Sequence, residues 1–324
     1  MFLSNEQSWT DNSFLNILAH ILNHIYLIYI LKILNMLRDC HAHSNGSEKA
    51  EDVVRAMEEA GVDQSVITSP YPRKRGTGID PKPTGYMQFS YSGVDEQSQL
   101  EAIRFISNLQ AEFPDKIVAF AWIEPRLKNA PKLIEEAVTK YECKGIKMIP
   151  DHWYPWETEF FPVYGKIQEL GVPVLFHSGI LYGFKDSSRF CRPCNYEVLV
   201  NFPQIRFALA HMSWPWTDEC IALFGRFRAN LESNPYSDKR ANKMQLYLDT
   251  TPGTPNFYRR EAFKRALMFG AEDYMLFGSD SSATNFSSAK ETSEMDRGII
   301  RELGYSEDTI KKILSENFKR FIKG

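Results

Sequence analysis

The chain has little cysteine and almost no excess of charge, and each shortage excludes a class of protein. Five cysteines, an odd number in 324 residues, do not form a disulfide framework, so we expect a protein of the reducing cytoplasm. A net charge of −3 gives no electrostatic basis for binding nucleic acid or an anionic membrane surface. With 43% hydrophobic and 24% charged residues, the chain has the composition of a soluble globular protein.

An unbroken apolar run of membrane-spanning length is also missing, although the amino terminus approaches one. Residues 14–31 carry no fixed charge and are rich in Leu, Ile and Tyr, but two asparagines and two histidines interrupt them. Glu6 and Asp11 stand where a secretory signal would be basic. We therefore interpret residues 1–35 as an N-terminal extension, either an appended helix or a translated segment before a natural start at Met36. A membrane anchor is the alternative.

The rest of the chain alternates strand-like apolar runs with amphipathic helical segments. The predicted strands are residues 36–43, 62–68, 117–123, 145–149, 172–177, 205–211, 244–249 and 274–280. Eight strands, each followed by a helix, predict an α/β fold with one domain over residues 36–324, a (β/α)8 TIM barrel. The alternative is an open doubly wound sheet, but no glycine-rich phosphate loop follows the first strand.

Histidine or aspartate stands at the end of several of these predicted strands. His41 and His43 end the first run, His177 and His211 end two later ones, and Asp280 ends the last. Barrels of this type place their chemistry at the carboxyl ends of the strands. Side chains two apart on a strand point to one face, so both imidazoles of the first pair can reach one ion. The pattern indicates a metal site at the barrel mouth.

Five short segments together resemble those of one known family. They are Asp39–His43, Gly145–Lys147, Phe176–Gly179, Ala210–Ser213 and Phe277–Asp280. With them, residues 36–324 resemble the amidohydrolase superfamily, in its amidohydrolase-related branch of metal-dependent hydrolases and decarboxylases. The resemblance implies a divalent metal ion, zinc or manganese, with one ion rather than two. It also implies that His41, His43, His177 and Asp280 surround the metal.

The same resemblance gives His211 and Asp280 catalytic roles. A divalent ion lowers the pKa of bound water and polarises a carbonyl group. Asp280 would take the proton of that water and deliver it to the leaving group. His211 would bind a second metal, or orient the water and stabilise developing negative charge. The alternative role for Asp280 is that of a helix N-cap.

Basic and aromatic residues near the strand ends are candidates for substrate binding. We predict this role for Lys147, Arg189, Trp153 and Trp214. In binuclear members of the superfamily a lysine at the position of Lys147 is carboxylated and bridges two metals. A further alternative is that Lys147 forms a salt bridge at the rim of the core. The loop side chains would otherwise serve loop packing or the interface of a homo-oligomer. His152 lies beside them, either in the pocket or on the surface.

The leading functional hypothesis is a metal-dependent hydrolase. It would cleave an amide, ester or lactone bond in a small, carboxylate-bearing substrate, with neither nucleic acid nor a membrane as partner. A non-oxidative decarboxylase of the same branch is the first alternative, and it would account for the loop arginines. The second alternative is a barrel that binds a ligand without catalysis, and the intact set of metal ligands counts against it.

Overall fold

The computed structural model describes residues 18, 20–22, 36–72, 79–81, 87–89, 94–184, 186–233 and 242–324. The chain divides into two units, Met1–Met36 and Leu37–Gly324. Most of the predicted N-terminal extension, residues 1–35, lies outside the described residues, so its role stays a prediction. Within the described parts of the chain, no helix is both long and apolar enough to span a membrane.

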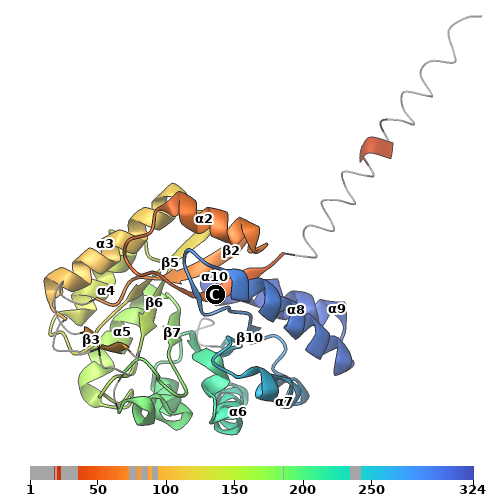
Figure 1. Cartoon of the computed structure of the whole chain (residues 1–324). Coiled ribbons are helices and arrows are strands. Elements are labelled where there is room, and N and C mark those ends of the chain that lie inside the picture. Colours follow the sequence, from red (N-terminus) through yellow and green to blue (C-terminus); the bar gives the residue numbers. More distant parts are fainter. Residues whose placement is uncertain are drawn as a thin grey trace, which may run out of the picture. The chain divides into compact units, whose positions relative to one another are not determined.

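The second unit is built on a single parallel sheet. Its strands in chain order are β1 (Arg38–His43), β2 (Gln64–Thr68), β5 (Ile117–Trp122), β6 (Gly145–Met148), β7 (Val174–Phe176), β8 (Phe207–Leu209), β9 (Leu246–Asp249), β10 (Met275–Leu276) and β11 (Ser281–Ser282). They lie in the order β10-β9-β8-β7-β6-β5-β2-β1-β11. Figure 1 shows helices arranged around these strands.

The two shortest strands, β10 and β11, together occupy the eighth position of the sheet. β10 pairs with β9, and β11 pairs with β1 on the other side. Between them, the backbone N–H of Cys40 donates to Phe277 and that of Asp280 donates to His41, both at 2.9 Å. The sheet therefore closes on itself, which confirms the predicted TIM barrel.

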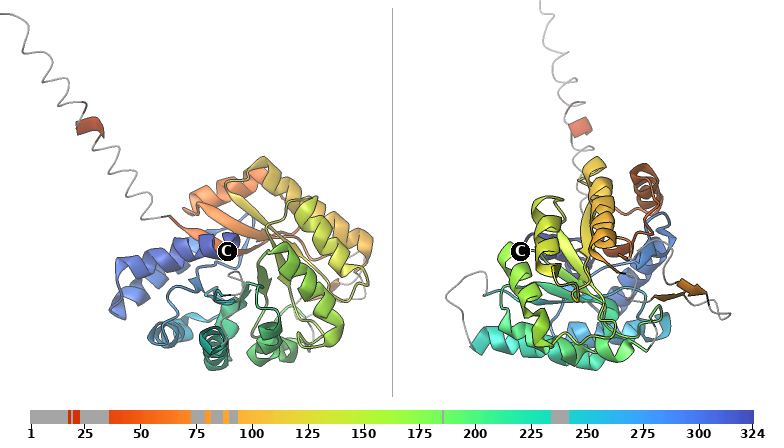
Figure 2. Two further views of the ribbon diagram at one scale, coloured as in Figure 1. Left: turned by 180° about the vertical axis from the view of Figure 1, so that it is seen from behind. Right: turned by 90° about the vertical axis from the view of Figure 1, so that its left-hand side faces the viewer.

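α-Helices follow most of the strands, as the alternating pattern predicted, whereas the segment between β7 and β8 is 3₁₀-helical at Ser188–Cys191 and Pro193–Asn201. The α-helices are α2 (Ala50–Glu59), α3 (Glu96–Glu112), α4 (Ala130–Thr139), α5 (Phe161–Leu170), α6 (Thr217–Ser233), α7 (Asn256–Met268), α8 (Ser287–Glu302), α9 (Glu307–Lys311) and α10 (Asn317–Lys323). Local signals set several ends: Asp95 caps α3, and Gly171 ends α5 in a left-handed conformation. Figure 2 shows this ring of helices from behind and from the side.

Two segments differ from the sequence-based prediction. The sequence predicts a helix over residues 47–60, with Ser47 as its N-cap. The helix begins only at Ala50, because the Glu48 carboxylate accepts the backbone N–H groups of Asn45, Gly46 and Ser47 and holds them in a turn. The long loop after β2 contains an antiparallel pair, β3 (Ile79–Pro81) and β4 (Met87–Phe89). Both differences lie outside the eight strand positions, so they leave the barrel intact.

Apolar side chains from the strands fill the barrel interior, and α10 covers its amino-terminal end. Phe318 and Phe321 of α10 pack with the interior cluster, which includes Phe120. Arg206, which precedes β8, donates to the carbonyls of Phe321 and Ile322 and so fixes α10 at that end. The candidate functional side chains lie at the opposite end of the barrel, where the strands end.

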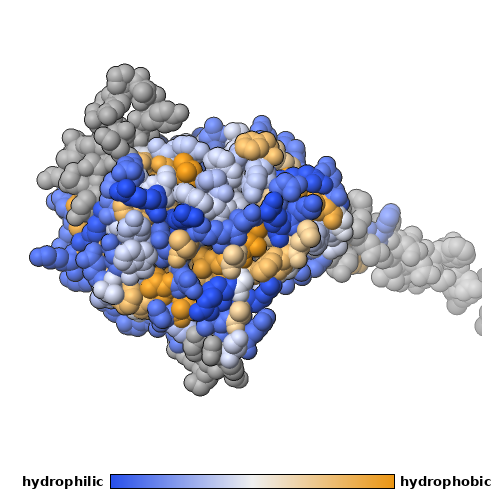
Figure 3. Space-filling view, turned by 90° about the horizontal axis from the view of Figure 1, so that it is seen from below, coloured by the Kyte–Doolittle hydropathy of each residue, from blue (hydrophilic) through white to orange (hydrophobic). Residues whose placement is uncertain are grey.

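On the face of the barrel seen in Figure 3, apolar side chains gather across the middle, and mostly hydrophilic side chains surround them. Phe257 and Met268 of α7 are among the large hydrophobic residues that the described chain exposes. Large exposed apolar groups are typical of subunit contacts, among other uses. The homo-oligomer expected from the sequence stays a prediction.

Candidate active site

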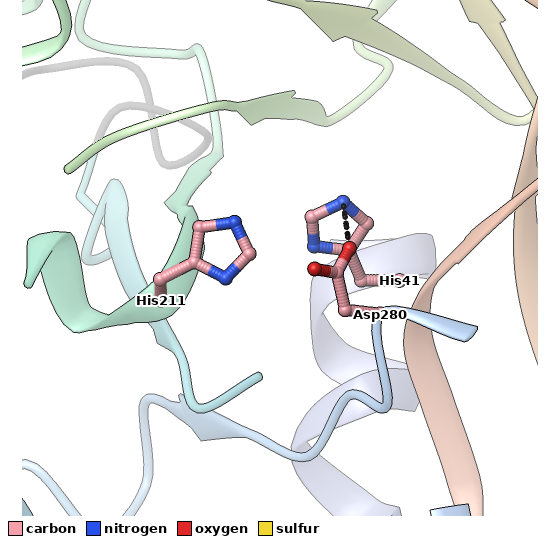
Figure 4. Close-up of side chains that lie close together, drawn as sticks. All are labelled: His41, His211 and Asp280. Carbon is pink, nitrogen blue, oxygen red and sulfur yellow. Dashed lines mark ion pairs between the residues drawn. The ribbon is translucent and has the colours of Figure 1, made fainter. Parts of the chain in front are cut away.

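Three of the predicted site residues form a compact group at the carboxyl ends of the strands. The potential ligand atoms of His41, His211 and Asp280 all lie within 4.8 Å of one another. His41 comes from β1, and His211 from the 3₁₀ turn Ala210–Ser213 after β8. Asp280 lies between β10 and β11, with one oxygen 3.6 Å from His41 Nε2. Figure 4 shows the Asp280 carboxylate against the ring of His41, with the ring of His211 facing the two across a gap.

The other two predicted metal ligands adjoin this group. His43 Nε2 lies 3.0 Å from Asp280 Oδ1, while its Nδ1 contacts the Thr68 hydroxyl, also at 3.0 Å. The His177 ring lies 5.0 Å from that of His211, and its Nε2 lies 3.2 Å from the Ile180 carbonyl oxygen. The structure thus brings His211 into the compact group, whereas His177 stands beside it.

A strained turn presents His211 to the site. His211, Met212 and Ser213 have φ angles of 59°, 44° and 57°, a run of left-handed residues that costs free energy and occurs mainly at functional sites. The segment after β9 holds this turn: the Thr254 hydroxyl donates to the His211 carbonyl, and Thr251 Oγ1 lies 2.7 Å from Nδ1. The predicted strand therefore ends two residues before His211, and the turn orients its ring.

Asp249, which the sequence analysis did not select, supports His41 from behind. Its Oδ2 lies 2.8 Å from His41 Nδ1, and both residues are fully buried. Lys147 Nζ approaches the other ring nitrogen, Nε2, at 2.9 Å. A sequence signal for Asp249 existed, because it ends a predicted strand as Asp280 does. Two carboxylates, one lysine and the imidazoles therefore form one connected network.

Burial and charge give these groups protonation states that suit a divalent metal ion. Burial lowers the pKa of His41 and His177 well below the usual value and also lowers that of His211, which favours the neutral form of each ring. Burial lowers the pKa of Lys147 to about 8. Burial acts to raise the pKa of Asp280, but His211 and the His43 hydrogen bond outweigh it and hold the pKa well below the usual range. Neutral imidazoles beside an ionised carboxylate are the ligands that zinc and manganese take in proteins.

A cavity of about 550 Å³ opens above the group. Its polar lining includes His43, His177, His211 and Asp280. Much of the rest is aromatic or aliphatic: Tyr71, Trp122, Ile149, Leu181, Phe184 and Trp214. The described part of this lining contains neither lysine nor arginine. The cavity thus combines a reactive polar region with walls suited to a planar or apolar body.

Only one of the four predicted substrate-binding residues, Trp214, lines this cavity. Trp153 is 1% exposed and packs on Phe160 in the core, so it cannot contact a substrate there. The Arg189 side chain is exposed and pairs with Asp186 at 3.4 Å, which directs it away from the described lining. Lys147 is fully buried below the imidazoles, where it contacts His41.

His152 is half-exposed and hydrogen-bonded to Asp151. It is absent from the described lining of the cavity. Of the two positions considered for it, pocket and surface, the structure favours the surface.

Comparison with known proteins agrees with the barrel. One solved structure with a similar fold is an uncharacterised TIM-barrel protein from Bordetella bronchiseptica, with a TM-score of 0.62 and 17% identity, covering 88% of this chain and 98% of its own. A 2,6-dihydroxybenzoate decarboxylase from Rhizobium follows, with a TM-score of 0.60 and 13% identity over 89% of this chain and 98% of its own. A 5-carboxyvanillate decarboxylase from Novosphingobium aromaticivorans, with bound manganese, has a TM-score of 0.58 and 12% identity over 89% and 97%.

Sequence comparison extends the agreement from fold to family. Among curated proteins, none matches the chain. A family model described as "Amidohydrolase" matches residues 38–323. The match spans the barrel and includes each of the five motif segments, from Asp39–His43 to Phe277–Asp280. The chain therefore belongs to the amidohydrolase family, whose members are enzymes that bind divalent metals.

Proposed function

We propose that this protein is a metal-dependent hydrolase that cleaves an amide, ester or lactone bond in a small molecule. The position of Asp280 is the observation that carries the proposal. Its side chain is 35% exposed at the cavity although its neighbours His41 and His211 are buried. An ionised carboxylate that faces both an imidazole cluster and a substrate-sized cavity is suited to remove a proton from water.

We place one divalent ion, zinc or manganese, among His41, His211 and Asp280, with His43 and His177 as the adjoining imidazoles. These residues fit an ion because their ligand atoms converge and two of the rings have a buried partner on the far side: Asp249 for His41 and Thr251 for His211. When bound, a divalent ion lowers the pKa of water and polarises a carbonyl group. Proton transfer and orientation are the tasks of the chain itself.

Asp280 takes the proton as a water oxygen attacks the substrate carbonyl, and it returns that proton to the leaving nitrogen or oxygen. The His43 Nε2–H group donates to Asp280 Oδ1 and holds the carboxylate in place. Trp214 and the aromatic walls at Trp122 and Phe184 exclude water from the body of the substrate. Bond cleavage consumes one water molecule and leaves Asp280 ionised for the next cycle.

Non-oxidative decarboxylation is the second candidate, and the aromatic walls favour it. Tyr71 packs edge-on against Trp122 and Phe184, with ring centroids 4.8 and 5.6 Å away. Such a wall suits an aromatic acid, and two structures with the same fold are decarboxylases of aromatic acids by name. In this reaction Asp280 relays a proton from a solvent water to the ring carbon, the carbon–carbon bond to the carboxylate then breaks with its electron pair returning to the ring, and carbon dioxide leaves.

Isotope labelling separates the two reactions. Zinc- or manganese-loaded protein would be incubated with a panel of lactones, amides and aromatic acids in H₂¹⁸O and, separately, in D₂O. Hydrolysis places one ¹⁸O in the product carboxylate, whereas decarboxylation releases carbon dioxide and places deuterium on the ring. His41→Ala is the control for contaminating enzymes. If protein of confirmed metal content turns over no member of the panel, hydrolysis of these substrate classes is excluded.

A further inference from the structure

The buried carboxylate of Asp249 contacts the imidazole of His41 directly and also contacts Thr251, which hydrogen-bonds the imidazole of His211. We propose that Asp249 is a positioning residue that fixes which nitrogen carries the proton on both His41 and His211, acting on the first ring directly and on the second through the Thr251 hydroxyl. The inference rests on the proposed function in one respect: both rings are taken to offer their second nitrogen, Nε2, to a metal ion.

The contact with His41 is direct. Asp249 Oδ2 lies 2.8 Å from Nδ1, and a carboxylate can only accept, so Nδ1 carries the proton. The other face of the ring agrees, because Lys147 Nζ lies 2.9 Å from Nε2 and a lysine amine donates to it. Both partners therefore favour the tautomer in which Nε2 keeps its lone pair.

The contact with His211 passes through Thr251. The Thr251 backbone N–H donates to Asp249 Oδ1 at 2.8 Å. The Thr251 hydroxyl oxygen accepts the backbone N–H of His211 at 3.2 Å, and its proton is placed to be donated to the same carboxylate. A hydroxyl has one proton to give. Once Asp249 receives it, Thr251 Oγ1, which lies 2.7 Å from His211 Nδ1, can only accept from that ring. His211 is thereby held in the same tautomer as His41.

The partners of the two rings are buried and closely packed. Asp249, Thr251 and His41 are fully buried. Gly278 lies against them: a methyl group there would stand 2.6 Å from the Thr251 Cγ2 atom and 3.2 Å from Asp249 Oδ1. In this packed setting the hydrogen-bond partner of each Nδ1 atom determines the position of the ring proton.

A second buried carboxylate provides a matched control. Asp39 Oδ1 accepts the backbone N–H of His41 at 2.9 Å and that of Ser279 at 3.0 Å, but no contact with the ring of His41 or His211 involves it among the described residues. Asp39→Asn and Asp249→Asn therefore make the same change of a buried carboxyl group to an amide at the same end of the barrel. Of the two, only Asp249→Asn alters a side chain that contacts the ring of His41 and the Thr251 support of His211.

The test reads the tautomers by NMR in metal-free protein labelled with ¹⁵N in the histidine rings. Long-range ¹H–¹⁵N correlations distinguish the two neutral forms, and we expect both His41 and His211 to carry the proton on Nδ1. The amide of Asp249→Asn has one oxygen for two sites, so at least one ring must move its proton to Nε2. Thr251→Val should release His211 alone, and Asp39→Asn should change neither ring.

Metal affinity gives the second readout. Competition with a chelating dye should show about 10- to 100-fold weaker zinc binding by Asp249→Asn, the usual effect of removing a carboxylate behind a ligating histidine. Unchanged tautomers in Asp249→Asn, or Nε2–H rings in the unmodified protein, would overturn the positioning role. If Asp249→Asn does not fold, Thr251→Val decides. If the tautomers shift as expected but the unmodified protein binds no divalent ion, the proposed function fails while the role of Asp249 stands.

Discussion

Asp280 combines two properties that single residues seldom combine: strong stabilisation of its charge and exposure to a substrate cavity. The imidazoles of His43 and His211 hold its pKa well below the usual range, although burial acts to raise it. Its left-handed backbone, with a φ angle of 54°, turns the side chain toward the cavity. A group held in this way keeps its negative charge across the neutral range and loses it only when the reaction delivers a proton.

Asp280→Asn tests that role. The amide keeps the shape of the carboxylate but cannot take a proton at neutral pH. We expect turnover to fall by about 10²-fold or more, the scale of a general acid–base group, with a much smaller change in substrate affinity. Steady-state kinetics on metal-loaded protein, with the substrate found by the isotope panel, measures both. Near-normal turnover with confirmed metal would show that another group, His211 first, acts as the base.

Gly253 is a second single-residue constraint on the site. A methyl group at this position would lie 2.3 Å from His211 Cγ, a separation that forces the ring to move. We expect Gly253→Ala to lower turnover by about 10²-fold, the effect of a small displacement of a catalytic group. Gly298→Ala is the matched control, because nothing lies within 4 Å of the added methyl group and Gly298 is inside α8.

The control should raise the free energy of unfolding by about 0.5–1 kcal/mol, because alanine favours a helix more than glycine does. Chemical denaturation and kinetics on both variants provide the comparison. Equal turnover in the two variants would mean that the ring of His211 has more freedom than its contacts indicate.

Strand-end positions in the sequence predicted the histidines and Asp280, whereas residue type alone misplaced Trp153 and Arg189. A histidine after an apolar run must lie at the carboxyl end of a strand, and the barrel brings those ends together. A tryptophan or arginine in a long loop has no such constraint: Trp153 turns into the core and Arg189 toward Asp186. The chain positions that the fold fixes were therefore predictable, and the side-chain directions within loops were not.

At the scale of elements, Asp39 joins the first strand to the last. Its carboxylate accepts the backbone N–H groups of His41 on β1 and of Ser279 between β10 and β11, and it also bonds the Ser279 hydroxyl. Burial raises the pKa of Asp39 to about 7. The hydrogen bonds from His41 and Ser279 act to lower this pKa, but the cost of burying the charge outweighs them, so the folded state is most stable when the carboxyl group is protonated.

This raised pKa predicts the direction of a pH effect. Between the unfolded value of 3.8 and the folded value of about 7, the folded state binds more protons. The stabilising contribution is complete below the unfolded value and is lost as the pH rises through the folded one, by up to about 4 kcal/mol. Asp39→Asn imitates the protonated form and should flatten this dependence. Urea denaturation of metal-free protein from pH 4.5 to 8 measures both slopes, and parallel curves would contradict the prediction.

Strands and long helices were predictable because their patterns extend over several residues. The buried run of β5 and the capped start of α3 illustrate this. The turn at His211 was not, because its left-handed conformations depend on Thr251 and Thr254, about forty residues away in the sequence. Glu48 likewise delays α2 by binding backbone groups that a helix would otherwise use. In both segments, hydrogen bonds from side chains or from distant residues override the local sequence pattern, so the pattern alone mispredicts the conformation.

At the scale of the whole molecule, the barrel accounts for all of the candidate site. The family match begins at residue 38, and the barrel unit begins at Leu37. We therefore expect a chain that starts at Met36 to fold, bind zinc and keep its activity. Thermal unfolding and elemental analysis of the shortened and full-length proteins test this. Loss of folding would show that residues 1–35 contribute to the stability of the barrel, and co-sedimentation of the full-length chain with membranes would favour an anchor.

With Asp280 in its proposed role, the division of the last strand position into β10 and β11 makes activity depend on closure of the barrel. Asp280 lies between the two pieces, and its backbone N–H is bonded to the first strand. A nascent chain that has made only its first seven strands holds the histidines but no reactive carboxylate, so it is inert toward the metabolites around it. Two fragments divided just before Met275 would share this property. Each fragment would be inactive alone, and activity would appear only when the two fragments associate and complete the barrel.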